Sequence, residues 1–215
     1  NSIDALSNTG ANSYTLSDSV DALLASTAAV KTGASAVQTS TTPLSVSQMN
    51  QLVSAYGTDD LADLTLAVAG TVAELATLTA ESLAEIKTAG GGGSLSVTGG
   101  TSASLAEVVA LKTTLGTIYA SLLPAYSVTD SQSNLTTGVA DATNLVVLNS
   151  AASVTLTGAA TVDQVADINT KLTAESGGLT AIAAGYELND SAANLAAATA
   201  SSVVDGASKI TVSGG

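Results

Sequence analysis

Acidic side chains are the groups in this chain with the most scope for chemistry. Asp59, Asp60 and Asp63 form the densest set, within the segment YGTDDLADL. Oxygen ligands suit a hard cation, so one interpretation of this set is a calcium site. The interpretation we favour is the first turn of a helix, where acidic side chains complement the helix dipole. The chain contains neither an EF-hand loop nor GGxGxD repeats, so the sequence signal for calcium is weak.

A second acidic set recurs within a ten-residue frame that we call the tyrosine unit. Its copies read YTLSDSVDAL from Tyr14, YSVTDSQSNL from Tyr126 and YELNDSAANL from Tyr186. Tyr-x-aliphatic predicts a short half-buried strand, and Asp-Ser predicts the N-cap of a following helix. The equivalent aspartates Asp18, Asp130 and Asp190 could instead form a ladder of cation ligands. Capping explains these aspartates without any ligand, and we favour it.

The residue types that are missing limit the chemistry further. The chain has no His, Cys or Arg, and its five cations are all Lys. Serine–histidine and cysteine–histidine nucleophiles, as well as zinc sites built on His or Cys, are therefore excluded. Phosphoryl transfer would lack an Arg clamp. We predict no catalytic residues, no cofactor-binding residues and no enzyme activity, although carboxylate chemistry remains formally open.

Composition indicates a packed protein with a thin core and an acidic surface. Of the 215 residues, 46% are hydrophobic but only 2% are aromatic, so the core must be layered from small aliphatic side chains. The formal net charge of −13 should repel nucleic acid and anionic lipid, and we predict neither as a partner. No apolar run approaches the roughly 18 residues of a membrane span, which predicts no membrane insertion.

A second pattern, the valine unit, interleaves with the tyrosine unit. Its fullest copy is ASVTLTGAATVDQVADI from Ala152, and related segments begin near Ser45, Ala62 and Ser94. Alternating apolar and Thr/Ser residues predict a strand, and the Gly that follows predicts a turn. Thr161 and Gln164 then have the spacing of a capping box at the start of a helix.

Alternation of the two units predicts the fold. Strand, turn and helix in repeated order indicate parallel strands linked by helical crossovers. We predict an α/β, solenoid-like stack of short parallel strands with short helical crossovers. It would form a single repeat array over residues 1–215, with a more irregular middle section at 57–125. The alternative is a β-solenoid in which the predicted helices are only turns.

The two ends of the chain resemble two halves of one valine unit. ITVSGG, which ends at Gly215, is similar to the strand half, and NSIDAL, which begins at Asn1, is similar to the helical half. Two explanations fit: the segment comes from a longer array, or successive chains associate head to tail through these half-units. A head-to-tail contact that does not close would generate filaments or sheets.

The segments YELNDSAANLAAA, ASKITVSGG and ASVTLTGAATVDQVADI resemble repeats of very large bacterial surface and secreted proteins. These include adhesin-like and S-layer-like proteins, some of which carry calcium-binding RTX segments elsewhere. The resemblance implies an extracellular or cell-surface location and a structural or adhesive role. We expect a structural module that assembles into a surface layer, filament or stalk. The alternative is an adhesin module that recognises a glycan or a surface.

Overall fold

The structure is a computed structural model, and it describes residues 14–57, 61, 66–88, 93–118, 125–174, 181–198 and 202–213. The chain divides into two compact units. Unit 1 contains residues 1–99 and 114–124, and unit 2 contains residues 100–113 and 125–215.

Unit 1 contains two parallel sheets. The first pairs β1 (Tyr14–Asp18) with β2 (Ala34–Thr39), and the chain between them forms α1 (Val20–Ala25) and α2 (Ala28–Thr32). The second sheet has the order β3 (Leu44–Ser45), β4 (Ala67–Gly70), β5 (Ser94–Val97). Helix α3 (Val46–Tyr56) connects β3 to β4, and α4 (Val72–Leu75) and α5 (Ala80–Thr88) connect β4 to β5.

Unit 2 contains two three-stranded parallel sheets. One has the order β6 (Ser102–Ala103), β7 (Ser127–Ser131), β8 (Val154–Thr157). The other has the order β9 (Ala159–Ala160), β10 (Tyr186–Asp190), β11 (Ala207–Val212). The connecting helices are α6 (Leu105–Leu115), α8 (Gln132–Ala140), α9 (Ala142–Ser150), α10 (Val162–Ala174), α11 (Ala192–Ala197) and α12 (Ser202–Asp205). The last two residues of α6 belong to unit 1, where the 3-10 helix η3 (Gly116–Ile118) follows them.

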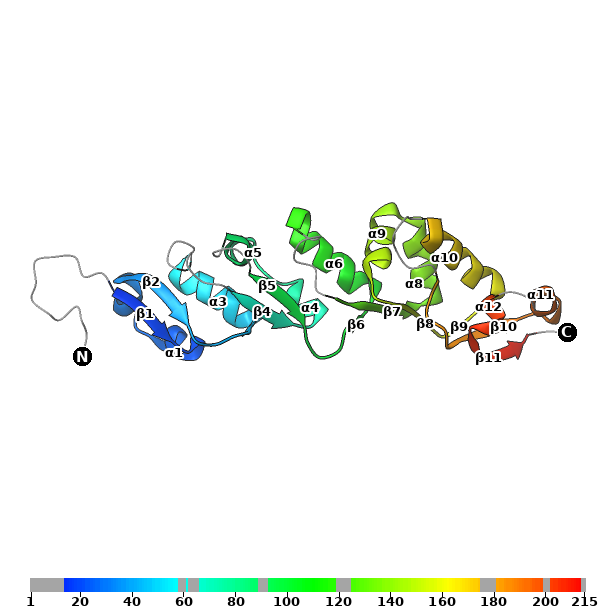
Figure 1. Ribbon diagram of the computed structural model, residues 1–215, viewed down its shortest axis with the longest axis horizontal. Coiled ribbons are helices and arrows are strands. Elements are labelled where there is room, and N and C mark those ends of the chain that lie inside the picture. Colours follow the sequence, from blue (N-terminus) through cyan, green and yellow to red (C-terminus); the bar gives the residue numbers. More distant parts are fainter. Residues whose placement is uncertain are drawn as a thin grey trace, which may run out of the picture. The chain divides into compact units, whose positions relative to one another are not determined.

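Each sheet buries one face, because side chains alternate across a strand. In β7, Val128 and Asp130 are buried while their neighbours on the strand are partly exposed. Helices α8, α9 and α10 lie on one side of this sheet (Figure 1). Their apolar side chains include Leu148 and Ile168, both fully buried. The core is therefore one layer of aliphatic side chains between helices and strands, as the low aromatic content requires.

The predicted short parallel strands with helical crossovers are confirmed. Every strand pair among the described residues is parallel, and α3 and α10 are 11 and 13 residues long. The β-solenoid alternative is wrong for these segments, because helices occupy them where it required turns. The single continuous array stays a prediction. The section predicted to be irregular contains β4, α4, α5, β5, β6 and α6.

The sequence assigns the segment from Ala62 to a valine unit, but the part that the structure describes, residues 66–75, takes a different place in the fold. Val68 of β4 pairs with both Leu44 and Leu95, as Val128 of β7 pairs with both of its neighbouring strands. Residues 66–75 therefore hold the position of a tyrosine unit, with Leu66 in the place of Tyr and Gly70 in the place of Asp. Strand alternation and a Ser or Thr cap are common to both units, so the sequence distinguishes them only by the Tyr and Asp, which are missing here.

Among the residues that the structure describes, no helix combines the length and the apolar character that a membrane crossing needs.

Candidate functional site

Asp130, the penultimate residue of the central strand β7, accepts hydrogen bonds from the starts of two helices. Oδ1 of Asp130 accepts hydrogen bonds from the backbone N–H of Ser131 at 2.8 Å and from Nδ2 of Asn134 at 2.6 Å. Its Oδ2 accepts from the backbone N–H of Leu105, the first residue of α6, at 3.0 Å. One carboxylate therefore satisfies amide donors at the starts of α8 and α6, where helices leave N–H groups unpaired.

Asp190 makes the same set of contacts in the next sheet. It accepts from the Ser191 N–H at 2.7 Å, from Nδ2 of Asn194 at 2.8 Å and from the N–H of Val162 at 3.0 Å. Val162 is the first residue of α10, as Leu105 is of α6. The bond from Asn194 and those from the two backbone amides hold the pKa of the Asp190 carboxyl below its usual range. The contact is thus a recurring one, which we call the carboxylate link.

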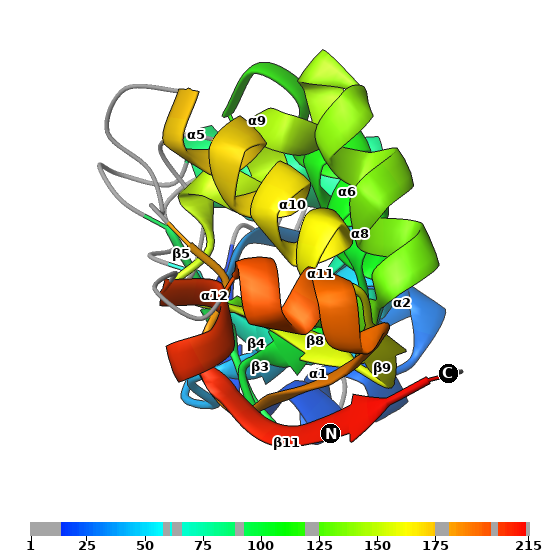
Figure 2. The same cartoon turned by 90° about the vertical axis from the view of Figure 1, so that its right-hand side faces the viewer.

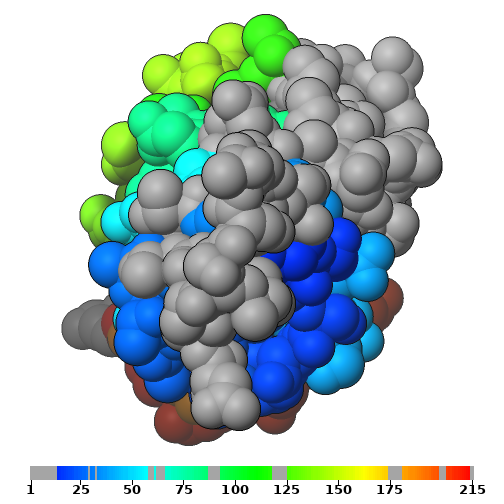
Figure 3. Space-filling view, turned by 90° about the vertical axis from the view of Figure 1, so that its left-hand side faces the viewer, coloured from blue at the N-terminus to red at the C-terminus, as the bar shows by residue number. Residues whose placement is uncertain are grey.

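The first tyrosine unit carries a simpler version of this arrangement. Asp18 is exposed, and among the described residues it accepts from the Ser19 N–H at 2.7 Å. Ala22 stands where the other two copies have Asn134 and Asn194, so the side-chain amide contact is lost. In the space-filling view of Figure 3, β1 and α1 belong to the residues coloured blue.

In the predicted Asp-Ser cap, the Ser and the Asp cap different helices. Ser19, Ser131 and Ser191 are the N-caps of the helices that follow them, and each side chain accepts an N–H three residues on. Asp130 and Asp190 instead cap the helix that precedes their own strand. Both oxygens of each of these two carboxylates already accept protein N–H groups, so the structure offers the cation-ladder alternative no support there.

Capping boxes start the long helices α3, α6 and α10. The predicted box of Thr161 and Gln164 is confirmed: the Thr161 hydroxyl accepts from the Gln164 N–H at 3.3 Å, and Oε1 of Gln164 accepts from the Thr161 N–H at 2.8 Å. Ser45 with Gln48 forms the same box at α3. At α6, Ser104 pairs with Glu107 in this way.

Each tyrosine of the tyrosine units fastens its strand to the second helix of the same unit. The hydroxyl donates to a valine carbonyl in every copy: Tyr14 to Val30 at 2.7 Å, Tyr126 to Val147 at 2.6 Å and Tyr186 to Val203 at 2.5 Å. Tyr126 and Tyr186 are buried. Burial, and secondarily the negative charge of Asp205, raises the pKa of the Tyr186 hydroxyl. The hydroxyl therefore stays a neutral donor across the physiological pH range.

Glycine leaves room for two of these hydroxyls. A Cβ at Gly206 would lie 2.7 Å from Oη of Tyr186, and a Cβ at Gly33 would lie 2.5 Å from Oη of Tyr14. Both distances are shorter than any ordinary contact, so even alanine would displace the ring. In the Tyr126 copy, Ser150 occupies the corresponding place, three residues after Val147, whose carbonyl accepts the bond.

The predicted calcium residues Asp59, Asp60 and Asp63 all lie outside the described residues. Within the part of the chain that the structure does describe, no group of three or more acidic side chains is arranged to hold a metal ion. The calcium site therefore stays a prediction.

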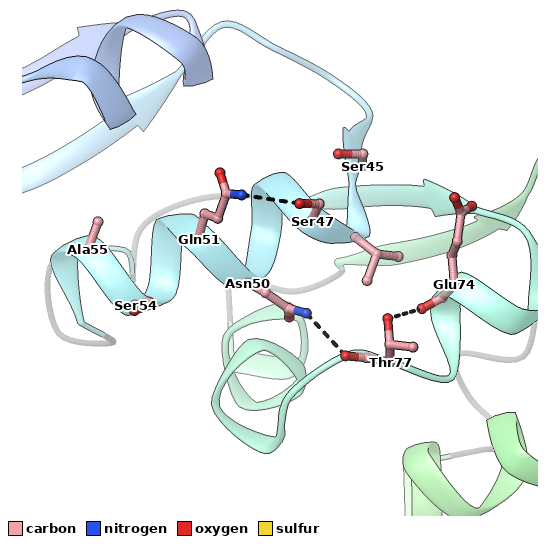
Figure 4. Close-up of a pocket in the computed structure, with 9 residues that line it drawn as sticks. Ser45, Ser47, Asn50, Gln51, Ser54, Ala55, Glu74 and Thr77 are labelled. Carbon is pink, nitrogen blue, oxygen red and sulfur yellow. Dashed lines mark hydrogen bonds between the residues drawn. The ribbon is translucent and has the colours of Figure 1, made fainter.

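An open groove of about 680 Å³ lies along α3 in unit 1, as Figure 4 shows. Several of its polar side chains bind one another or the backbone: Nδ2 of Asn50 donates to the Thr77 carbonyl at 3.1 Å, and Nε2 of Gln51 donates to Oγ of Ser47 at 3.2 Å. Glu74, its one acidic residue, accepts from the Thr71 N–H at 2.7 Å. A single, engaged carboxylate cannot supply the pair of acids that glycoside hydrolysis uses.

The functional residues that sequence reasoning missed are Asn134 and Asn194, together with the amides of Leu105 and Val162. The asparagines left a visible signal, because Asn-Leu ends the frame in both copies whose aspartate is buried. The backbone amides left none, since every residue type except proline carries a backbone N–H. No protein-family model, no curated protein and no solved structure matches this chain.

Proposed function

We propose that this chain is a non-enzymatic structural module of an extracellular bacterial repeat protein, which assembles into a surface layer, filament or stalk. In this proposal the tyrosine and valine units alternate along one solenoid-like α/β stack. The observation that carries the proposal is the carboxylate link, made in the same way by Asp130 and Asp190.

The carboxylate link supports a structural role because of what it connects. Each link joins the helix of a valine unit to the strand and helix of the tyrosine unit that follows it. In stacked repeats, stability is approximately the sum of each repeat and its contacts with its neighbours. Side chains that could bind a ligand, above all the aspartates of the recurring frame, are used instead to hold neighbouring units together.

The extracellular part of the proposal rests on the sequence. The segments that resemble surface-protein repeats include both the Asp190 frame and the Thr161 capping box. An excess of 13 negative charges keeps separate molecules apart until salt or a cation screens them. That property suits a module that must be exported before it assembles.

Immunogold electron microscopy of the organism that makes the protein tests this proposal. Antibodies raised against the 215-residue chain should label a layer, filament or stalk on intact, unpermeabilised cells. Antibodies first absorbed with the purified chain are the matched control and should give no labelling. Labelling that appears only after permeabilisation would contradict the proposal.

A further inference from the structure

The described residues contain three joints between a valine-unit helix and the tyrosine unit that follows it, and one of these joints has no aspartate. In unit 2, the first residue of α6 or α10 donates its N–H to Asp130 or Asp190 near the end of the next central strand. Figure 2 shows α10, together with α8 and α9, on one side of strands β8 and β9. In unit 1, Gly70 stands at the place of the aspartate. The joint between α3 and β4 must therefore be held by other contacts.

Glu74 replaces only half of the contacts of the missing aspartate. Its Oε2 accepts from the Thr71 N–H at 2.7 Å, as each aspartate of unit 2 accepts from the serine that follows it. A Cβ at Gly70 would lie 3.2 Å from this oxygen, so the Glu74 carboxylate lies beside the place of the missing side chain. The N–H of Val46, the first residue of α3, has no acceptor among the described residues. The half that is lost is therefore the contact that crosses the joint.

Asn50 of α3 makes the contacts that cross this joint instead. Its Oδ1 accepts from the N–H of Thr79 at 3.2 Å and from the hydroxyl of Ser82 at 2.8 Å, both at the start of α5. Its Nδ2 donates to the carbonyl of Thr77, two residues beyond the end of α4, at 3.1 Å (Figure 4). One side-chain amide thus binds donors at a helix start and a carbonyl beyond a helix end, where backbone groups are otherwise left unpaired.

The residue types at the Asn50 position and at the aspartate position change together among the three joints. Counted from the residue that caps each helix, Val109 of α6 and Ala166 of α10 occupy the place of Asn50. Neither of these side chains can form a hydrogen bond, and each of the two helices is followed by a strand that carries an aspartate. Asn stands at this place only in the joint where Gly70 replaces the aspartate. This exchange is expected if each joint needs one polar side chain that reaches across it.

We infer that Asn50 is the positioning residue of the joint between α3 and β4, where its neutral amide does the work of the missing aspartate. Helix α3 packs against both β4 and α5. Asn50 fixes α3 against the turn between α4 and α5, whereas the carboxylate links fix a helix start at a strand end. The inference rests on the structural role that the proposed function gives to such links, and it adds a second kind of link. A unit without the aspartate is therefore still joined to the unit before it.

Hydrogen exchange of the full chain, resolved by NMR for single amides, tests this inference. Asn50→Ala should lower the protection of the Thr79 amide at least about tenfold, and that of the α3 amide of Val53 at least about fivefold. Gln51→Ala is the matched control, because the Gln51 side chain bonds only to Ser47 within α3. It should change both protections less than about twofold. Alanine favours a helix more than Asn or Gln does, so helix propensity cannot cause the loss.

A rescue variant distinguishes positioning of the helix from a purely local contact. Gly70→Asp combined with Glu74→Asn gives this frame the residues of unit 2, so that a carboxylate can accept from the Val46 N–H. Glu74→Asn also removes the oxygen that a Cβ at Gly70 would meet. In this background Asn50→Ala should still expose the Thr79 amide, but the protection of the Val53 amide should fall less than about twofold. Circular dichroism of each variant must match that of the wild type.

Two results would overturn the inference. If Val53 loses no more protection in Asn50→Ala than in Gln51→Ala, Asn50 does not position α3, and this comparison decides the matter even if the rescue variant fails to fold. If the rescue variant folds but the loss at Val53 stays undiminished, the aspartate and Asn50 do not perform the same task. Antibody labelling of cells depends on neither result, so failure of the inference is distinguishable from failure of the proposed function.

Discussion

Asp130→Asn is the substitution that tests the carboxylate link most directly. Asparagine has nearly the same shape but offers one side-chain oxygen in place of two. Oδ1 and Oδ2 of Asp130 together accept from Ser131, Asn134 and Leu105. If the amide oxygen faces the first two donors, its NH₂ group faces the Leu105 N–H and that bond is lost. The opposite orientation loses two bonds.

The expected cost follows from these contacts. A hydrogen bond to a charged group contributes about 1.5–3 kcal/mol, and a buried donor left without an acceptor costs about 1–3 kcal/mol. Asp130 is only 9% exposed, so water cannot fully replace it. We expect the free energy of unfolding to fall by about 2–3 kcal/mol, which corresponds to a decrease of about 4–12 °C in Tm for a chain of this size.

Equilibrium urea unfolding, followed by circular dichroism, measures this change. Asp18→Asn is the matched control, because it makes the same substitution and the same charge change at an exposed copy of the frame. It should change stability by less than about 0.5 kcal/mol. Hydrogen exchange should also quicken at the Leu105 amide in the Asp130 variant. Equal losses in the two variants, or unchanged exchange at Leu105, would refute the link.

Three further results are expected. Tyr126→Phe should cost about 1–3 kcal/mol in urea unfolding, because it leaves a buried carbonyl unpaired, whereas Tyr14→Phe, at a half-buried copy, should cost less; equal costs would contradict this. In a double-mutant cycle, Gly206→Ala and Tyr186→Phe should together cost less than the sum of the single changes, since Phe lacks the oxygen that Ala would strike; strict additivity would exclude the clash. Acid titration should show that Asp190 stabilises the fold above the ordinary Asp pKa of about 3.9, and that this contribution is lost as the pH falls through its lowered pKa in the folded state; an Asp190→Asn chain with the same acid-unfolding curve as the wild type would oppose this.

The individual strands and helix caps of the fold can be predicted from the sequence. Tyr-x-aliphatic predicted strands that the structure contains at β1 and β10, and Thr161 with Gln164 predicted the capping box of α10. These features depend on neighbours within a few residues of one another, where strand alternation and capping act. The same holds for the parallel, helix-linked arrangement, which a repeated strand–helix order strongly favours.

The contacts that join units do not follow from the sequence, because their partners are distant and carry no side-chain signature. Asp130 reaches the amide of Leu105, which lies 25 residues before it, and Asp190 reaches that of Val162, 28 residues before it. Nor could the frame at Leu66–Leu75 be identified, since Leu and Gly replace the Tyr and Asp that mark it. Only the pairing of Val68 with strands on both sides reveals its place.

A core of small aliphatic side chains explains why such links are needed. Val, Leu and Ala present similar surfaces, so many helix positions over a sheet would bury nearly the same apolar area. A buried carboxylate is far less tolerant of a shift in helix position, because leaving it without its hydrogen bonds raises the free energy of the folded state. Asp130 is fully bonded only when α6 begins beside the end of β7, and Asp190 only when α10 begins beside the end of β10. We infer that the aspartates fix which helix start lies at which strand end, while the aliphatic layer supplies most of the burial.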